Sequence, residues 1–154
     1  MEWLPNTNVN EVIGLLEIVN DNDGTIALDD LHNTTGIDVD DLLFVVDAGE
    51  MLGFITVEKH RIHLTKKGKN FLSLDPDKRK EELSKYIADL DIFKFLFKEF
   101  MKRGGEMSYS EFLHLIKGYT NNKSAEKEVL NILHWGQYAG ILDYDPTTKR
   151  IVVL

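Results

Sequence analysis

The sequence has no cysteine among its 154 residues. This absence excludes disulfide bonds and thiolate metal sites, and it suits a reducing cytoplasm. No stretch approaches the roughly 18 consecutive apolar residues that a membrane-spanning helix needs. The first residues, MEWLPNTNVNE, have neither the basic nor the apolar region of a signal peptide. We therefore expect a soluble cytoplasmic protein without membrane insertion.

Positive charge is also missing from the N-terminal part of the chain. Residues 1–58 contain 13 Asp and Glu and no Lys or Arg, and five basic residues then follow within positions 59–69. The formal net charge of −8 divides into −9 for residues 1–75 and +1 for residues 76–154. Such asymmetry indicates either a surface that meets a partner or a solvated acidic face.

The apolar spacing of the first half predicts three helices. One covers about residues 9–19, a short one follows near 28–33, and a third begins after Asp38 as N-cap and ends at Gly53. The positions expected to be buried in the third helix follow the spacing i, i+3, i+4 and i+7: Val39, Leu42, Leu43 and Val46.

A two-stranded hairpin is predicted directly after these helices. Ile55 and Val57 alternate with polar residues on the outward strand, and Ile62 and Leu64 do so on the return strand. Thr65 is placed to cap a last short helix. Three helices followed by a hairpin is the element order of the winged helix, a variant of the helix-turn-helix.

The second half predicts the same order after a helix that begins at Asp75-Pro76. The stretch DIFKFLFKEFM, at 91–101, is helical, and its aromatic residues, Phe97 included, are expected in a core. Ser108 and Glu111 form a capping box before another helix. A final helix near 124–139 leads into a hairpin that turns at Asp145-Pro146.

The two halves align with an offset of 87 positions. Leu42, Leu43 and Val46 then fall on Val129, Leu130 and Leu133, while Gly53 falls on Gly140. We therefore expect a mostly α fold with small β-hairpins (α+β), built from two tandem winged-helix units packed around bridging helices. The first, acidic unit would cover residues 1–75, and the bridging helices with the second unit would cover 76–154.

Three stretches resemble a known family: LGF at 52–54, LTKKG at 64–68 and WGQYAGILDYD at 135–145. They are similar to the AAA-associated C-terminal domain of ATP-binding subunits of ABC transporters of the nitrate, sulfonate and bicarbonate type. Trp135 to Ala139 match that family's Trp-Gly-Arg/Gln-Tyr-Ala run. The resemblance implies a protein partner, an ABC transporter ATPase or permease, or self-association.

The ATPase of that family is absent from this sequence. It has no G-x-x-x-x-G-K-[ST] loop, whose backbone N–H groups and lysine hold phosphates in P-loop proteins. We therefore expect the accessory domain on its own, acting as a non-enzymatic interaction and regulatory module.

The residues give little support to catalysis, so we assign no catalytic, cofactor-binding or metal site. His60 and His63 lie three apart on the hairpin and face opposite sides of the pleat, which makes them poor partners for one metal. Asp40 and Asp41 fall in the first turn of a helix, where the macrodipole favours negative charge by about 0.3–1 kcal/mol each.

A winged-helix DNA-binding transcriptional regulator is the alternative function. The would-be recognition helix opposes it, because that helix carries four acids and no base and would repel phosphates. The second unit is near neutral there, with Lys123 and Lys127 against Glu126 and Glu128. A small ligand held between the two units is a third alternative, without a sequence motif of its own.

The candidate partner contacts are therefore surface charges and two aromatic residues. Lys66 and Lys67 stand at a helix N-terminus, where the dipole disfavours cations, so we expect them to face an acidic protein surface, either the Asp40/Asp47 helix or a partner. Trp135 has the core as its alternative place. The full set is Asp40, Asp41, Asp47, Glu50, Lys59, Arg61, Lys66, Lys67, Trp135 and Tyr138.

Overall fold

The structure is a computed structural model that describes residues 2–120 and 124–154. It confirms the expected fold class, because the described residues form eight helices and two small antiparallel sheets. The chain divides into two compact units. The N-terminal unit is Pro5–Glu82, and the C-terminal unit is Leu83–Leu154 together with the segment that ends at Leu4. The long helix α5 (Pro76–Ala88) contributes residues to both units.

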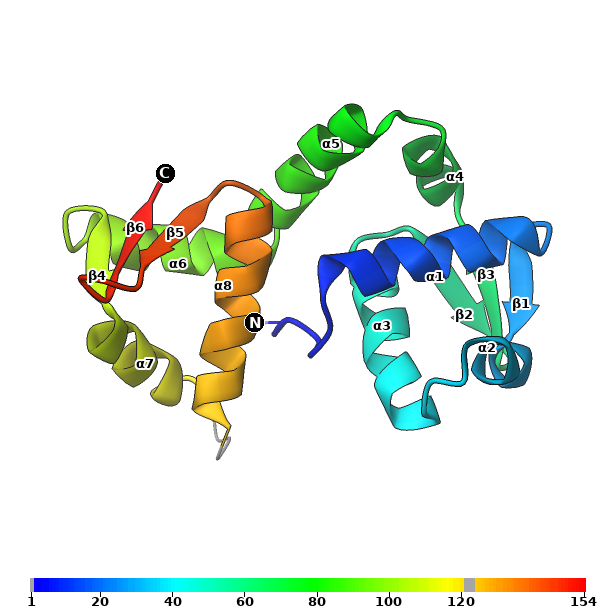
Figure 1. Cartoon of the computed structure of the whole chain (residues 1–154), viewed down its shortest axis with the longest axis horizontal. Helices are drawn as coiled ribbons and strands as arrows, with labels where there is room; N and C mark the ends of the chain where they lie inside the picture. The colour runs from blue at the N-terminus through cyan, green and yellow to red at the C-terminus, as the bar shows by residue number, and fades with distance from the viewer. Residues whose placement is uncertain (1, 121–123) are drawn as a thin grey trace. The chain divides into compact units, whose positions relative to one another are not determined.

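The N-terminal unit contains four helices and one three-stranded sheet. Helix α1 packs on α3, on the sheet and on α4 (Figure 1). The sheet has the order β1-β3-β2 with all pairs antiparallel. The elements are α1 (Val9–Asp21), β1 (Thr25–Ala27), α2 (Leu28–Thr35), α3 (Val39–Met51), β2 (Ile55–Glu58), β3 (Arg61–Leu64) and α4 (Lys66–Leu72).

The predicted hairpin is present as the antiparallel pair β2–β3, and the structure adds a third strand, β1, to it. Ile55 pairs with Leu64 and Glu58 with Arg61 across the β2–β3 turn. The turn residues Lys59 and His60 both have positive φ, 50° and 63°, as a tight two-residue hairpin turn demands. The extra strand β1 covers three residues and exists because β3 supplies the backbone partners along its free edge.

The helix caps of this unit follow the sequence prediction. The Asp38 carboxylate accepts from the amide of Val39 at 3.1 Å, and the Thr65 hydroxyl accepts from the amide of Gly68 at 3.0 Å. Gly53 has φ 78°, the left-handed conformation expected where α3 ends.

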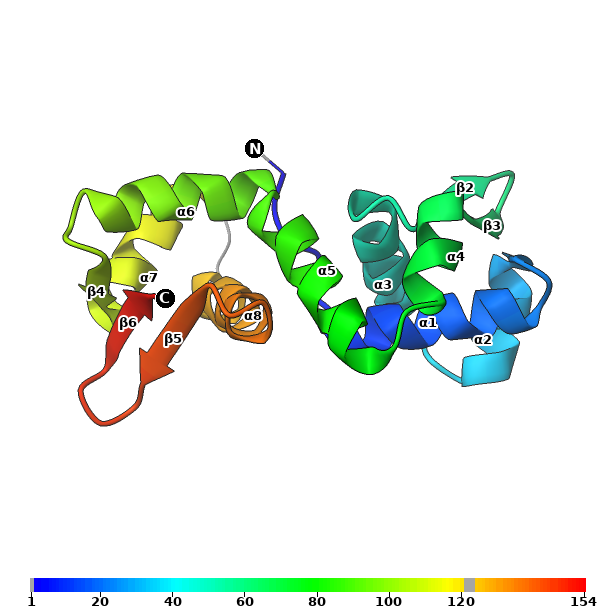
Figure 2. The same cartoon turned by 90° about the horizontal axis from the view of Figure 1, so that it is seen from above.

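The C-terminal unit repeats this arrangement with different residues. Helices α6, α7 and α8 surround a sheet of order β4-β6-β5 (Figure 2). The expected capping box is formed between Ser108 and Glu111. The elements are α6 (Asp91–Met101), β4 (Glu106–Ser108), α7 (Tyr109–Lys117), α8 (Ala125–Tyr138), β5 (Leu142–Asp145) and β6 (Arg150–Val153).

The two units share a set of backbone hydrogen bonds at corresponding positions. The amide of Phe54 donates to the carbonyl of Gly49 at 3.0 Å, and the amide of Ile141 donates to that of Gly136 at 2.9 Å. Both pairs are 87 positions apart. Each glycine also lets its helix approach the next strand, because a Cβ would lie 2.9 Å from Ile55 in the first case and from Leu142 in the second.

Three residues predicted to be buried are exposed instead. Val39 is 37% exposed, Leu43 42% and Phe97 50%. Helix α3 turns Leu42, Val45 and Val46 inward, so Leu43 falls on its solvent side. Phe97 likewise falls outside the buried stripe of α6, which consists of Ile92, Phe93, Leu96 and Phe100.

None of the described helices combines the length and the apolar character needed to cross a membrane.

Candidate functional site

Helix α3 separates its residues into a buried side and an outward side. Its inward residues pack against α1, and Gly49 among them permits close contact with Ile55. The outward residues recur at intervals of three and four, which places them on one side of an α-helix. We call these residues the α3 outer face: Asp40, Leu43, Phe44, Asp47 and Glu50.

The α3 outer face combines large apolar side chains with carboxylates. Leu43 is 42% exposed and Phe44 41% exposed. The carboxylates of Asp40, Asp47 and Glu50 make no hydrogen bond or ion pair with any residue that the structure describes. Exposed apolar side chains bordered by charge are typical of protein-binding surfaces. The face offers no donor to phosphate, because α3 carries no Lys or Arg.

Sequence reasoning found the acids of this face and missed its apolar half. Leu43 was expected in the core, and Phe44 was not singled out. A second pattern was available in the sequence, because Leu42, Val45, Val46 and Gly49 follow the same i, i+3, i+4, i+7 spacing and leave Leu43 and Phe44 outside it. Asp41 is exposed as well, and its carboxylate lacks a partner among the described residues.

The basic residues of the hairpin lie on the surface of the same unit. Lys59 occupies the β2–β3 turn. The Arg61 Nε donates to the hydroxyl of Thr25 on β1 at 2.9 Å, so this guanidinium is tied to its own sheet. Both side chains are exposed.

The two lysines at the start of α4 have different surroundings. The Lys67 Nζ donates to the backbone carbonyl of Leu52, where α3 ends, at 2.7 Å, and it lies 5.5 Å from the centre of the Phe54 ring. This bond is to a backbone carbonyl at the C-terminal end of α3, which carries partial negative charge, rather than to the carboxylate that the sequence predicted. Lys66 is exposed and makes no hydrogen bond or ion pair with a described residue.

The two aromatic candidates differ in exposure, and one of them needs correction. Trp135 is 0% exposed. It is therefore a core residue, and the prediction that it contacts a partner was wrong. It is buried together with Val129, Ile132 and Leu133 of the same helix. Tyr138 is partly exposed, and burial raises the pKa of its hydroxyl.

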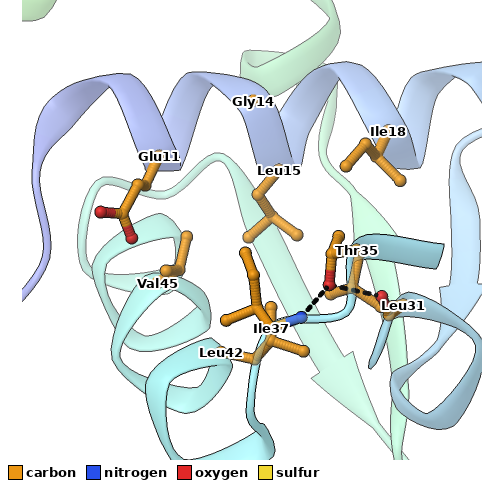
Figure 3. A pocket seen from close by; sticks show the side chains of 9 residues that line it. All are labelled: Glu11, Gly14, Leu15, Ile18, Leu31, Thr35, Ile37, Leu42 and Val45. Atoms are coloured by element: carbon orange, nitrogen blue, oxygen red, sulfur yellow. Dashed lines mark hydrogen bonds between the residues drawn. The ribbon is translucent and has the colours of Figure 1, made fainter. Parts of the chain in front are cut away.

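An apolar cavity of about 160 Å³ lies between α1, α2 and α3 in the N-terminal unit (Figure 3). No pattern in the sequence predicted this cavity. Gly14 and the carboxylate of Glu11 border it on α1. Its apolar walls are Leu15, Ile18, Leu31, Ile37, Leu42 and Val45.

The titratable groups do not gather into a catalytic or metal-binding cluster within residues 2–120 and 124–154. No three or more His, Asp or Glu side chains there are placed to hold a metal ion. Lys123, expected beside Lys127 at the start of α8, lies outside the described residues. Glu128 on that helix is partly buried, which raises the pKa of its carboxyl group, and its Oε2 has no hydrogen-bond partner among the described residues.

Comparison with known proteins agrees with the resemblance carried by the Trp135 run. No curated protein and no solved structure shows significant similarity to the chain. The pattern of the C-terminal AAA-associated domain matches residues 29–145, which include α2 to α8 and the first strand of the last hairpin. This match covers well over half of the chain. The chain therefore belongs to the family of C-terminal AAA-associated domains, which are appended to ABC-type ATPases.

Proposed function

We propose that this chain is a non-enzymatic, cytoplasmic interaction module that regulates an ABC-type ATPase or its permease by binding it. The observation that carries the proposal is the α3 outer face. Its two apolar side chains, Leu43 and Phe44, are about 40% exposed, and its carboxylates have no partner among the described residues. Family membership supports an ATPase as the class of partner.

We also infer that the two units are tandem winged helices. Support comes from the identical strand orders of the two sheets and from the backbone hydrogen bonds that recur 87 positions apart. In a winged helix that binds DNA, the helix before the wing enters the major groove. Here that helix is α3, and its acids favour a protein surface over a phosphate backbone.

Sedimentation velocity tests the proposal on the full chain. The chain is run alone, with an ABC-type ATPase prepared without its own C-terminal domain, and with a 20-base-pair duplex at low salt. We expect a complex with the ATPase. Sedimentation of the chain as a dimer would direct the same face to self-association. Absence of both a complex with the ATPase and a dimer would contradict the proposal.

DNA binding is the second candidate function, favoured by the exposed Lys59 and Arg61 of the hairpin. Phosphate contacts weaken with salt in proportion to their number. A complex with the duplex that dissociates steeply between low and physiological salt, and that is lost when both residues are changed to alanine, would favour this candidate. Absence of binding at low salt removes it.

A further inference from the structure

The cavity between α1, α2 and α3 has the size and lining of a receptor for one apolar side chain. Its volume is about 160 Å³. An apolar cavity of about 150 Å³ is large enough to hold benzene. Six aliphatic side chains form the walls (Figure 3). Ile37 among them is 37% exposed, so part of the lining is in contact with solvent.

The polar groups around the cavity already make hydrogen bonds within the chain, although the Glu11 carboxylate can accept further ones. The Thr35 hydroxyl donates to the carbonyl of Leu31 at 2.9 Å and accepts from the amide of Ile37 at 3.2 Å. The Glu11 carboxylate accepts from the Asn8 side chain at 2.8 Å and from the Thr7 hydroxyl at 3.2 Å. The cavity therefore selects its occupant by apolar character and shape, and its walls leave no neutral donor for an anion.

Gly14 keeps the α1 side of the cavity open. A glycine inside a helix destabilises it relative to alanine. Packing gives no reason for this glycine, because a Cβ at position 14 would meet nothing within 4 Å. Gly14 is among the residues that line the cavity, so a longer side chain at this position would extend over the α1 side of the cavity.

The charges on the three helices that enclose the cavity are all of one sign. Helices α1, α2 and α3 carry nine Asp and Glu and no Lys or Arg. Glu17 is paired with Arg79 at 3.2 Å, but Glu11 borders the cavity and Asp41 lies one turn before the wall residue Val45. An apolar cavity with a negative rim attracts cations and repels anions.

We propose that this cavity receives an apolar side chain from a basic segment of the protein partner. The inference rests on the proposed function and gives the partner's chemistry: one leucine-sized or phenylalanine-sized anchor flanked by lysine or arginine. The apolar walls hold the anchor. The flanking cations are attracted by the carboxylates of Glu11, at the border of the cavity, and of Asp41, one helical turn before the wall residue Val45.

Nuclear magnetic resonance titration of the full chain tests this with three peptides. The first has a central leucine with three lysines on each side, the second replaces the leucine by alanine, and the third replaces the lysines by glutamates. We expect the first to shift the amide signals of Gly14 and Leu31. The second should bind about tenfold more weakly or worse, because burying a leucine is worth that much. The third should not bind.

A matched pair of variants at position 14 separates cavity filling from helix stabilisation. Gly14→Ala adds a methyl group that meets nothing, so it should raise the melting temperature and retain binding of the leucine peptide. Gly14→Leu should raise the melting temperature as well and lose that binding. Binding of the leucine peptide by Gly14→Leu with wild-type affinity would overturn the proposal.

A second pair of variants tests the rim. The double variant Glu11→Gln/Asp41→Asn should weaken the leucine peptide several-fold and flatten its salt dependence, while Asp47→Asn on the α3 outer face should not. Equal binding of the glutamate peptide, or binding of pentylammonium as tight as that of the leucine peptide, would contradict the assignment to a basic protein segment.

Failure of this inference and failure of the proposed function have different outcomes. If the ATPase binds the wild-type chain and Gly14→Leu equally well, the cavity is not the receptor, although the interaction module stands. If the ATPase does not bind and the chain does not dimerise, the proposed function fails whatever the peptides do.

Discussion

The two units share one strand order but differ in charge, since the N-terminal unit is acidic and the C-terminal unit is neutral. Their sheets share one strand order, and both glycine-to-strand contacts occur at corresponding positions. The N-terminal unit holds 16 acidic and 8 basic residues, whereas the C-terminal unit holds 10 of each. The shared strand order therefore does not set the surface charge, which depends on the outward side chains of each unit.

The contrast is sharpest between α3 and α8. When the two halves are aligned with the offset of 87 positions, four residues of the α3 outer face correspond to neutral or basic residues of α8. Leu43 corresponds to Leu130, so that one apolar position is common to both helices. The replaced positions are Asp40 with Lys127, Phe44 with Asn131, Asp47 with His134 and Glu50 with Gln137.

The largest expected effect concerns Trp135, whose burial anchors the core side of α8. Replacing a fully buried tryptophan by alanine costs about 3–5 kcal/mol, whereas Tyr138→Ala, at a partly exposed position, should cost much less. Urea unfolding followed by circular dichroism measures both. Equal losses for the two variants would mean that the assignment of Trp135 to the core is wrong.

The glycine contacts give the next largest effect and test how alike the units are. A Cβ at position 136 would lie 2.9–3.1 Å from three atoms of Leu142, including its Cβ, but at position 49 it would press on the mobile end of Ile55. We expect Gly136→Ala to cost about 1–3 kcal/mol, and Gly49→Ala to cost less. A larger loss for Gly49→Ala than for Gly136→Ala in thermal unfolding would contradict this difference in packing between the two units.

Local rules predicted much of this fold from sequence. The caps at Thr65 and Ser108 and the turn at Gly53 depend only on residues nearby in the sequence, so the sequence is sufficient to predict them. Strand β1 was missed because Ile26 is its one strongly apolar residue and its partner, β3, is 36 positions away.

The candidate site was predicted less completely, for a physical reason. The acids of α3 needed no structure, since charge is read directly from sequence. Which apolar residues face solvent is decided by tertiary packing, as Leu43 and Trp135 show in opposite directions. The cavity also depends on how three helices meet, which no local pattern encodes.

A smaller effect is expected where α4 meets the end of α3. Lys67→Ala removes the bond to the Leu52 carbonyl and the contact with the Phe54 ring, so it should cost about 1 kcal/mol. Lys66→Ala removes a cation that the helix dipole disfavours, so it should not lower the free energy of unfolding. Urea titration at low salt distinguishes them, and equal effects would remove the structural role of Lys67.

The smallest effect concerns Glu128 in the C-terminal unit. Burial raises the pKa of this carboxyl group above its ordinary value of 4.5. The folded state therefore holds the proton more tightly than the unfolded chain, so the carboxylate destabilises the fold above that pH and ceases to do so below it. At pH 7, Glu128→Gln should stabilise by roughly 0.5 kcal/mol, little because the side chain is partly solvated.

The exposed neighbour Glu126 provides the control for this titration. Glu126→Gln removes a first-turn charge that the helix dipole favours, so it should lower the melting temperature slightly at pH 7 and less at pH 4. The gain from Glu128→Gln has the opposite sign and should vanish at pH 4. A gain that persists at pH 4 would show that the effect is not one of charge burial.

The central claim is that the α3 outer face binds an ABC-type ATPase. Isothermal titration calorimetry tests it most directly, by measuring the affinity of the chain for such an ATPase prepared without its own C-terminal domain. The double variant Leu43→Ala/Phe44→Ala removes the apolar half of the α3 outer face, and Leu130→Ala removes the corresponding exposed leucine of α8. The account predicts a loss of at least about tenfold for the double variant, as for the centre of a protein interface, and no loss for Leu130→Ala. Wild-type affinity in the double variant would contradict it.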